Sequence, residues 1–247
     1  MCRKQHGSLL NTSLGVARAA FEWISGAGDV VRYRASAAFE RPFCRQCGAN
    51  VPAVSHDERY WHVPAGLLDD SVDARPRSHI FVASRLPLTE LDDGLPKHAA
   101  YPRDLASPTV APARKHDATA AVGGSCLCGA IVFAASELPR RLVNCYCSLC
   151  RRSRAAAFSS TLLVPAEAFR FVAGAERVRR YALPPPRHYA TAFCADCGSP
   201  APSAPAGSQA VLLPAGAIDT PLPPLRAVHL YVDSKASWYE LNSRRGE

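Results

Sequence analysis

The chain has 247 residues, of which 48% are hydrophobic and 20% charged, and its formal net charge is +8. No apolar run approaches the roughly 20 residues of a membrane-spanning helix, and the N-terminal sequence lacks the pattern of a secretory signal. We therefore expect a globular cytoplasmic protein with no membrane partner. The ten cysteines are too sparse for a small disulfide scaffold, and in a reducing compartment close cysteines more often bind metal.

The positive charge is concentrated in the second half of the chain. Residues 123–247 contain 14 Lys and Arg against 8 Asp and Glu, a net charge of 14 − 8 = +6. Such an excess is typical of an ordinary solvated surface or of attraction to an anionic partner. The ordinary surface is the simpler interpretation, and a nucleic-acid partner is kept as the alternative.

Two related copies of one sequence follow each other along the chain. "FCRQCGANVPA" from Phe43 matches "FCADCGSPAPS" from Phe193, and "PAGLLDD" from Pro64 matches "PAGAIDT" from Pro214, both at an offset of 150. Upstream the offset is 148, which aligns Cys2 with Cys150. We predict one domain over residues 1–102, a Pro-, Ala- and Ser-rich linker over 103–122, and a second domain over 123–247.

The first copy has no counterpart of residues 123–148, so it is predicted to be a front-truncated, degenerate version of the second. Met1 is the only methionine. Either the first domain itself has degenerated, or the sequence begins at an internal methionine of a longer protein.

Short segments rich in β-branched and aromatic residues predict strands in the second copy. Residues 165–174 begin with Pro and end with Gly, which predicts a helical turn. Strands separated by turn-rich sequence predict a mainly β fold, built twice, with small antiparallel sheets. The predicted strands cover residues 130–135, 141–147, 158–164, 178–183, 190–194, 210–216 and 228–233.

Seven cysteines of the second copy form three groups, which suit zinc because it favours tetrahedral sites with thiolate ligands. The two outer pairs together offer four ligands and predict a closed, structural site. The middle group offers three ligands from one short loop and leaves a fourth position open for water or substrate, which is the catalytic arrangement. Buried reduced thiols, disulfides and a metal-free redox loop are the alternatives. The groups are Cys126 and Cys128; Cys145, Cys147 and Cys150; Cys194 and Cys197.

The first copy has only Cys2, Cys44 and Cys47, so we expect it to build no complete zinc site. His79 and His229 stand at matching strand starts. We expect both to be structural histidines with satisfied hydrogen bonds rather than functional ones.

Several motifs in one order resemble the glutathione-dependent formaldehyde-activating family, which includes centromere protein V. They are "GSCLCGAIVF", "NCYCSLCRR", "FCADCGSP", "PAGAID" and "HLYVDSKASWYEL". The resemblance covers nearly all of residues 123–241 and, as a truncated copy, residues 1–102. It implies a zinc-binding β-tent fold in tandem. It also implies an enzyme that joins glutathione and formaldehyde into S-hydroxymethylglutathione, a carbon–sulfur lyase in the reverse sense.

By this resemblance two zinc ions bind the C-terminal domain. Cys126, Cys128, Cys194 and Cys197 would hold the structural zinc, and Cys145, Cys147 and Cys150 the catalytic zinc that meets glutathione. Such a zinc would lower the pKa of an incoming thiol and present a thiolate to a small carbonyl.

Arg151, Arg152 and Arg154 would attract the carboxylates of glutathione, or they form an ordinary basic surface. Tyr146 and Ala155 depart from the family's usual histidine and glycine, so a related thiol adduct or another small carbonyl stays open as substrate. The alternative function is a non-catalytic zinc module that binds nucleic acid or protein.

Overall fold

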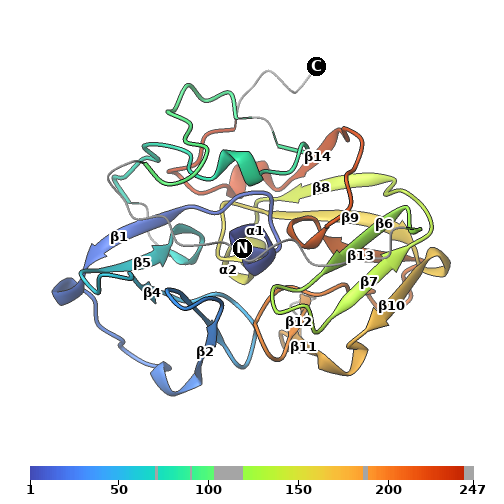
Figure 1. Ribbon diagram of the computed structural model, residues 1–247, viewed down its shortest axis with the longest axis horizontal. Coiled ribbons are helices and arrows are strands. Elements are labelled where there is room, and N and C mark those ends of the chain that lie inside the picture. Colours follow the sequence, from blue (N-terminus) through green and yellow to red (C-terminus); the bar gives the residue numbers. More distant parts are fainter. Residues whose placement is uncertain (70–71, 90, 103–118, 186–188, 242–247) are drawn as a thin grey trace.

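The computed structural model describes residues 1–69, 72–89, 91–102, 119–185 and 189–241. Figure 1 shows the strands of the first copy beside those of the second, with the helix α1 between them. None of the helices in these ranges is long and apolar enough to cross a membrane. The predicted linker lies mostly outside the described residues, and its last residue, Val122, is already the first residue of a strand.

The regular elements are short. The first copy contains α1 (Cys2–His6), β1 (Ser13–Ala17), β2 (Val30–Arg34), β3 (Glu40–Cys44), β4 (Ala53–Val54) and β5 (Tyr60–Pro64). The second contains β6 (Val122–Ser125), β7 (Val132–Ala135), β8 (Arg141–Cys145), α2 (Ser148–Arg154), β9 (Ser159–Pro165), β10 (Phe169–Ala173), β11 (Val178–Ala182), β12 (Ala190–Cys194), β13 (Ala210–Pro214) and β14 (Ala227–Leu230). Single turns of 3-10 helix are η1 (Arg18–Ala20), η2 (Ala27–Asp29), η3 (Ala65–Leu67), η4 (Val82–Ser84), η5 (Ala166–Ala168), η6 (Ala175–Arg177), η7 (Ala215–Ala217) and η8 (Val232–Ser234).

These strands form five small sheets. The first copy contains the sheet β1-β5-β4 and the ribbon β2-β3, and the second contains β10-β7-β6, β11-β12 and β13-β9-β8-β14. The named strands pair antiparallel except β14, which runs parallel to β8. The prediction of a mainly β fold with small antiparallel sheets is confirmed.

The sequence repeat recurs in the strand register. Ser13 pairs with Pro64 in the first copy, and at the matching positions Thr161 pairs with Pro214 in the second. The ribbon β2-β3 likewise pairs Val30 with Cys44, as β11-β12 pairs Val178 with Cys194. Equivalent residues therefore occupy equivalent places in the two sheets.

Two local predictions were wrong or incomplete. Of the helical turn predicted over 165–174, only Ala166–Ala168 is helical, and the rest is strand β10. The strand wins because Phe171 pairs with Phe133 of β7 and both Phe169 and Phe171 pack against the core. The predicted loop after Cys147 is instead the helix α2.

The hydrophobic clusters draw on both copies. The largest is built from buried side chains of β6, β7, β8, β9 and β13, with Leu9 and Leu88 added from the first copy. Another joins Ala65 of the first copy to Tyr146, Phe158 and Trp238 of the second. Because apolar burial is the main stabilising term, each copy depends on the other for part of its core.

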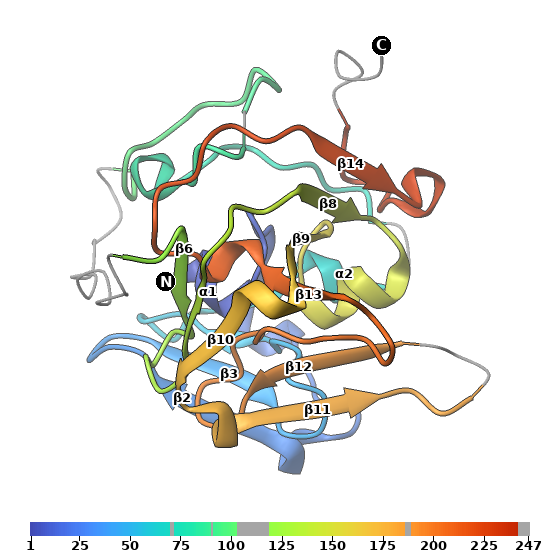
Figure 2. The ribbon, with the colours of Figure 1, turned by 90° about the vertical axis from the view of Figure 1, so that its right-hand side faces the viewer.

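Each of the two α-helices packs against the other copy (Figure 2). Helix α1 packs against η7 of the second copy, and α2 packs against η3 of the first. The contacts are close enough to require glycine, because a Cβ on Gly216 would overlap the carbonyl of Arg3 and a Cβ on Gly66 would overlap the backbone of Ala156. The packing is therefore reciprocal, since each copy contributes one helix and one 3-10 turn to these contacts.

We predict that Gly66→Ala destabilises the protein by about 2 kcal/mol or more, since overpacking against backbone leaves no side chain free to move away. The clash would push α2 from its place. Gly15→Ala is the matched control, because a Cβ there has no neighbour within 4 Å. Urea unfolding of both variants checks the prediction, and equal stabilities would contradict the exchanged packing.

The backbone segment that pairs with the equivalent histidines, His79 and His229, differs between the two copies. In the second copy His229 pairs in parallel with Asn144 of β8. In the first copy the matching residue, His79, forms a parallel bridge with Lys97, and its backbone bonds to Pro96 and His98 at 2.8 Å each. Beside His79, residues 96–98 thus take the place that β8 has beside His229.

Candidate metal centres

The outer cysteine pairs meet in one cluster. The sulfur atoms of Cys126, Cys128, Cys194 and Cys197 all lie within 4.8 Å of one another. The Sγ atoms of Cys126 and Cys128 are 3.3 Å apart, and those of Cys128 and Cys194 are 3.8 Å apart. Four thiolates around a zinc ion at about 2.3 Å stand about 3.8 Å from one another, so the cluster could hold such an ion.

The backbone around this cluster is arranged for thiolates. The amide of Ile131 donates to Cys126 Sγ at 3.2 Å, and Ser199 Oγ accepts from the amide of Leu127 at 3.1 Å. Gly198, at φ +70°, closes the turn after Cys197, and the ring of Phe43 fills the space that a Cβ there would need. Left-handed backbone of this kind favours glycine.

The cluster needs a cation if its sulfurs are to be thiolates together. Hydrogen bonding to Cys126 raises the pKa of Cys194 and also that of Cys128. Like charges this close disfavour one another, and a bound metal removes that penalty because coordinated thiols lose their protons. The donor set therefore fits a metal ion.

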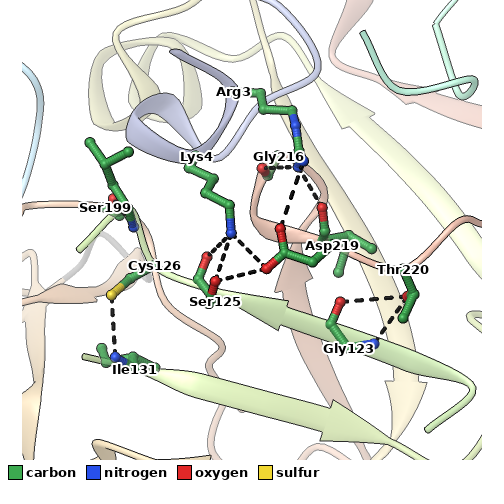
Figure 3. Close-up of polar contacts among 12 residues, drawn as sticks. Arg3, Lys4, Gly123, Ser125, Cys126, Ile131, Ser199, Gly216, Asp219 and Thr220 are labelled. Atoms are coloured by element: carbon green, nitrogen blue, oxygen red, sulfur yellow. Dashed lines mark hydrogen bonds and ion pairs between the residues drawn. The ribbon is translucent and has the colours of Figure 1, made fainter. Parts of the chain in front are cut away.

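Helix α1 of the first copy is anchored next to this cluster (Figure 3). Lys4 Nζ donates to the carbonyl and the hydroxyl of Ser125, at 2.9 and 2.7 Å, and lies 2.7 Å from Asp219 Oδ2. Arg3 donates to the carbonyl of Gly216 at 2.8 Å. The Asp219 side chain is 1% exposed, so this is a buried ion pair between the copies. Sequence reasoning missed it because no local pattern relates residues 215 positions apart.

The middle cysteine group forms a second cluster. The sulfur atoms of Cys145, Cys147 and Cys150 lie within 4.8 Å of one another, with 3.6 Å between the first two. Cys145 ends β8, and the Cys147 sulfur caps α2 by accepting from the amide of Cys150 at 3.5 Å. Among the described residues no His, Asp or Glu joins the group as a fourth ligand.

Tyr146, which lies between two of these cysteines, is held in place by a contact with His229. Tyr146 is fully buried, and its hydroxyl lies 2.9 Å from His229 Nδ1. Its ring also packs against Phe158. His79 in the first copy lies 2.7 Å from Asp93 Oδ2, so both histidines have the structural partners we expected.

The predicted arginines all belong to α2 but have different surroundings. Arg151 Nε donates to the carbonyl of Tyr146 at 3.3 Å. Arg152 is exposed and pairs with Asp69 of the first copy. Arg154 Nε is buried and has no hydrogen-bond partner within the described residues. The carboxylate of Asp69 from the first copy thus lies beside α2, which follows the three-cysteine group of the second copy.

The two clusters are the groups of three or more potential metal ligands that the described residues contain. Neither includes Cys2, Cys44 or Cys47 of the first copy. In the first copy Cys2 Sγ instead accepts a hydrogen bond from Arg41 at 3.4 Å.

Comparison with known proteins agrees with the cysteine pattern. The model of the family "Glutathione-dependent formaldehyde-activating enzyme" matches residues 1–84 and 121–234. A curated protein of Halomonas elongata, named "Putative glutathione-dependent formaldehyde-activating enzyme", is 35% identical over 132 residues, which cover 49% of this chain and 81% of that protein. The matched ranges include most of both copies and all the cysteines of the two clusters. The chain is a member of the glutathione-dependent formaldehyde-activating enzyme family.

Proposed function

We propose that the chain is a zinc-dependent carbon–sulfur lyase that forms or cleaves the adduct of glutathione, or a related thiol, with formaldehyde or another small carbonyl. The observation that carries the proposal is the cluster of Cys145, Cys147 and Cys150, whose three sulfurs leave one tetrahedral position without a protein ligand among the described residues. Family membership supplies the substrate class.

In this proposal the two clusters have different tasks. Zinc held by Cys126, Cys128, Cys194 and Cys197 is structural, because it would join the loop after β6 to the turn after β12. Cys145, Cys147 and Cys150 would hold the catalytic zinc, which would supply a lowered pKa for a substrate thiol and so favour its nucleophilic thiolate form.

The chain's own residues would position the substrate. Arg151 and Arg152 lie in α2, directly after the metal-binding loop, and could bind the carboxylates of glutathione by charge-assisted hydrogen bonds. Arg152 already binds a carboxylate, that of Asp69, so substrate would compete with this exposed ion pair. An exposed pair is worth at most about 1 kcal/mol, which a substrate carboxylate can replace.

Cys147→Ser tests this proposal. Serine can cap α2 as the thiol does, so the variant should keep its fold while losing one metal ligand. We predict that the metal content falls from two zinc ions per chain to one, and that turnover of the formaldehyde–glutathione adduct falls by about 100-fold or more. Native mass spectrometry and a rate assay measure both.

Cys2→Ser is the matched control, because Cys2 occupies the position of Cys150 in the first copy and belongs to neither cluster. It should keep two zinc ions and wild-type turnover. Full activity of Cys147→Ser with one zinc ion lost would refute the catalytic role of the open site.

A second candidate is a zinc module that binds nucleic acid or another polyanion. One observation favours it: a groove of about 360 Å³ between the ribbons β2-β3 and β11-β12, with Arg45, Arg179 and Arg180 in its walls. Binding of DNA that weakens steeply as salt rises would support this candidate, as would a chain that lacks turnover with both zinc ions bound.

A further inference from the structure

The first copy contains a polar cavity of about 40 Å³ that the proposed lyase function does not use. It lies between α1, the sheet β1-β5-β4 and the ribbon β2-β3. Gln5 and Asn50 are buried in its floor, Arg41 is half-buried in its wall, and His62 stands exposed at its rim. A cavity of this size has room for a few water molecules or for a ligand of three or four heavy atoms.

Arg41 gives the cavity its charge. Its guanidinium donates one hydrogen bond, to Cys2 Sγ at 3.4 Å, while its Nε atom is buried and has no partner in the part of the chain that the structure describes. A guanidinium has five N–H groups in a planar fork that fits a carboxylate. The buried Nε is closed off from the cavity, so a ligand would meet the terminal N–H groups of the fork.

The other walls contribute polar groups but no negative charge. Among the described residues that line the cavity there is no Asp or Glu, and Asn11 and Ser13 join His62 at the rim. Although part of the His62 side chain reaches solvent, desolvation of its ring, and secondarily Arg41, lowers the pKa of His62, and Asp57 opposes the shift more weakly. Burial also lowers the pKa of His6 to about 4, so this histidine is neutral near pH 7.

The second copy provides an internal comparison. At the positions of Arg41 and His62 it has Thr191 and Leu212, and at the position of Asn50 it has Pro200. The second copy thus lacks the Arg41 guanidinium and the His62 imidazole, although it has Arg154 at the position of His6, another residue that lines the cavity. The pair Arg41 and His62 is therefore particular to the first copy.

We infer that this cavity binds a small planar oxyanion of the carboxylate or bicarbonate class, with Arg41 as its main ligand and Asn50 and His62 as further donors. The inference is independent of both metal clusters.

The test is an NMR titration of the full zinc-loaded chain with formate and with bicarbonate at constant ionic strength. The signals to follow are the His62 ring and the Asn50 side-chain amide, with chloride and sulfate as comparison anions. For so few heavy atoms we expect saturable binding with a dissociation constant on the order of 1 mM, and a rise in the pKa of His62. Saturation of these signals by formate or by bicarbonate, and not by chloride or sulfate, would support the inference.

Arg41→Thr, which introduces the second copy's residue, should weaken binding by about tenfold or more. Arg45→Thr is the matched control, because Arg45 is exposed at the end of the same strand and does not line the cavity. Should Arg41→Thr fail to fold, His62→Leu can be titrated through the Asn50 signal and should bind more weakly than the wild type. The inference fails if no anion saturates these signals, if chloride and sulfate bind as tightly, or if the folded Arg41→Thr variant binds like the wild type.

Discussion

Cys197→Ser is expected to prevent the second copy from folding stably. If the four-cysteine cluster holds zinc, the replacement leaves three thiolates in a mostly buried site: Cys194 and Cys197 are fully buried, Cys126 is 2% exposed, and Cys128 is partly exposed. Structural zinc contributes about 10–16 kcal/mol in small zinc-binding peptides. That equals or exceeds the whole stability of a typical domain, about 5–15 kcal/mol. Circular dichroism and metal content of the purified variant measure the effect.

The first copy offers a matched control for this variant. Cys47 stands at the position of Cys197 in the repeat, but it belongs to neither ligand cluster in the described part of the chain. We expect Cys47→Ser to keep the metal content and to shift the unfolding midpoint only slightly. Equal behaviour of the two variants would show that the cluster around Cys197 contributes no metal-dependent stability.

The second large effect is expected for Lys4→Met. Lys4 reaches from the first copy to Asp219 and Ser125 of the second, and the aspartate side chain is 1% exposed. Removing one partner of a buried ion pair costs about 3–5 kcal/mol because the other charge stays buried. Arg3, 3.7 Å from Asp219 Oδ1, keeps part of the compensation, so we expect about 3 kcal/mol. Urea unfolding gives the number.

Two comparisons make this measurement specific. Lys235→Met removes an exposed lysine and should change the free energy of unfolding by less than about 0.5 kcal/mol. Lys4→Met combined with Asp219→Leu removes both charges and should recover part of the loss, as coupled residues do. A cost below about 1 kcal/mol for Lys4→Met alone would show that α1 is not held by this pair.

Much of the local structure was predictable because it depends on short patterns. The strands predicted at 158–164 and 190–194 match β9 and β12 to within one residue, and the strand predicted at 210–216 begins correctly but ends at Pro214, where η7 follows. The cysteine groups were brought together as their spacing indicated. The repeat also fixed the register of equivalent strand pairs. In each case the signal lies within a few residues or in a direct comparison of two segments.

What was missed depends on contacts between distant residues. Helix α2 reads as a polar loop, "SLCRRSR", with no apolar face, and it forms where the Cys147 sulfur caps it and η3 of the other copy packs against it. The exchange of α1 and α2 likewise rests on Gly66 and Gly216, whose neighbours lie far away in the sequence. The sequence around a glycine does not indicate which distant backbone segment will pack against it.

The bridge between His79 and Lys97 has a consequence for how the fold tolerates rearrangement. The position beside residue 79 is taken by a segment that follows it in the chain, whereas the position beside residue 229 is taken by one that precedes it. Residues 96–98 also lie outside the ranges that match the family model. The place beside this histidine therefore requires a parallel backbone, which can come from either side of the histidine along the chain.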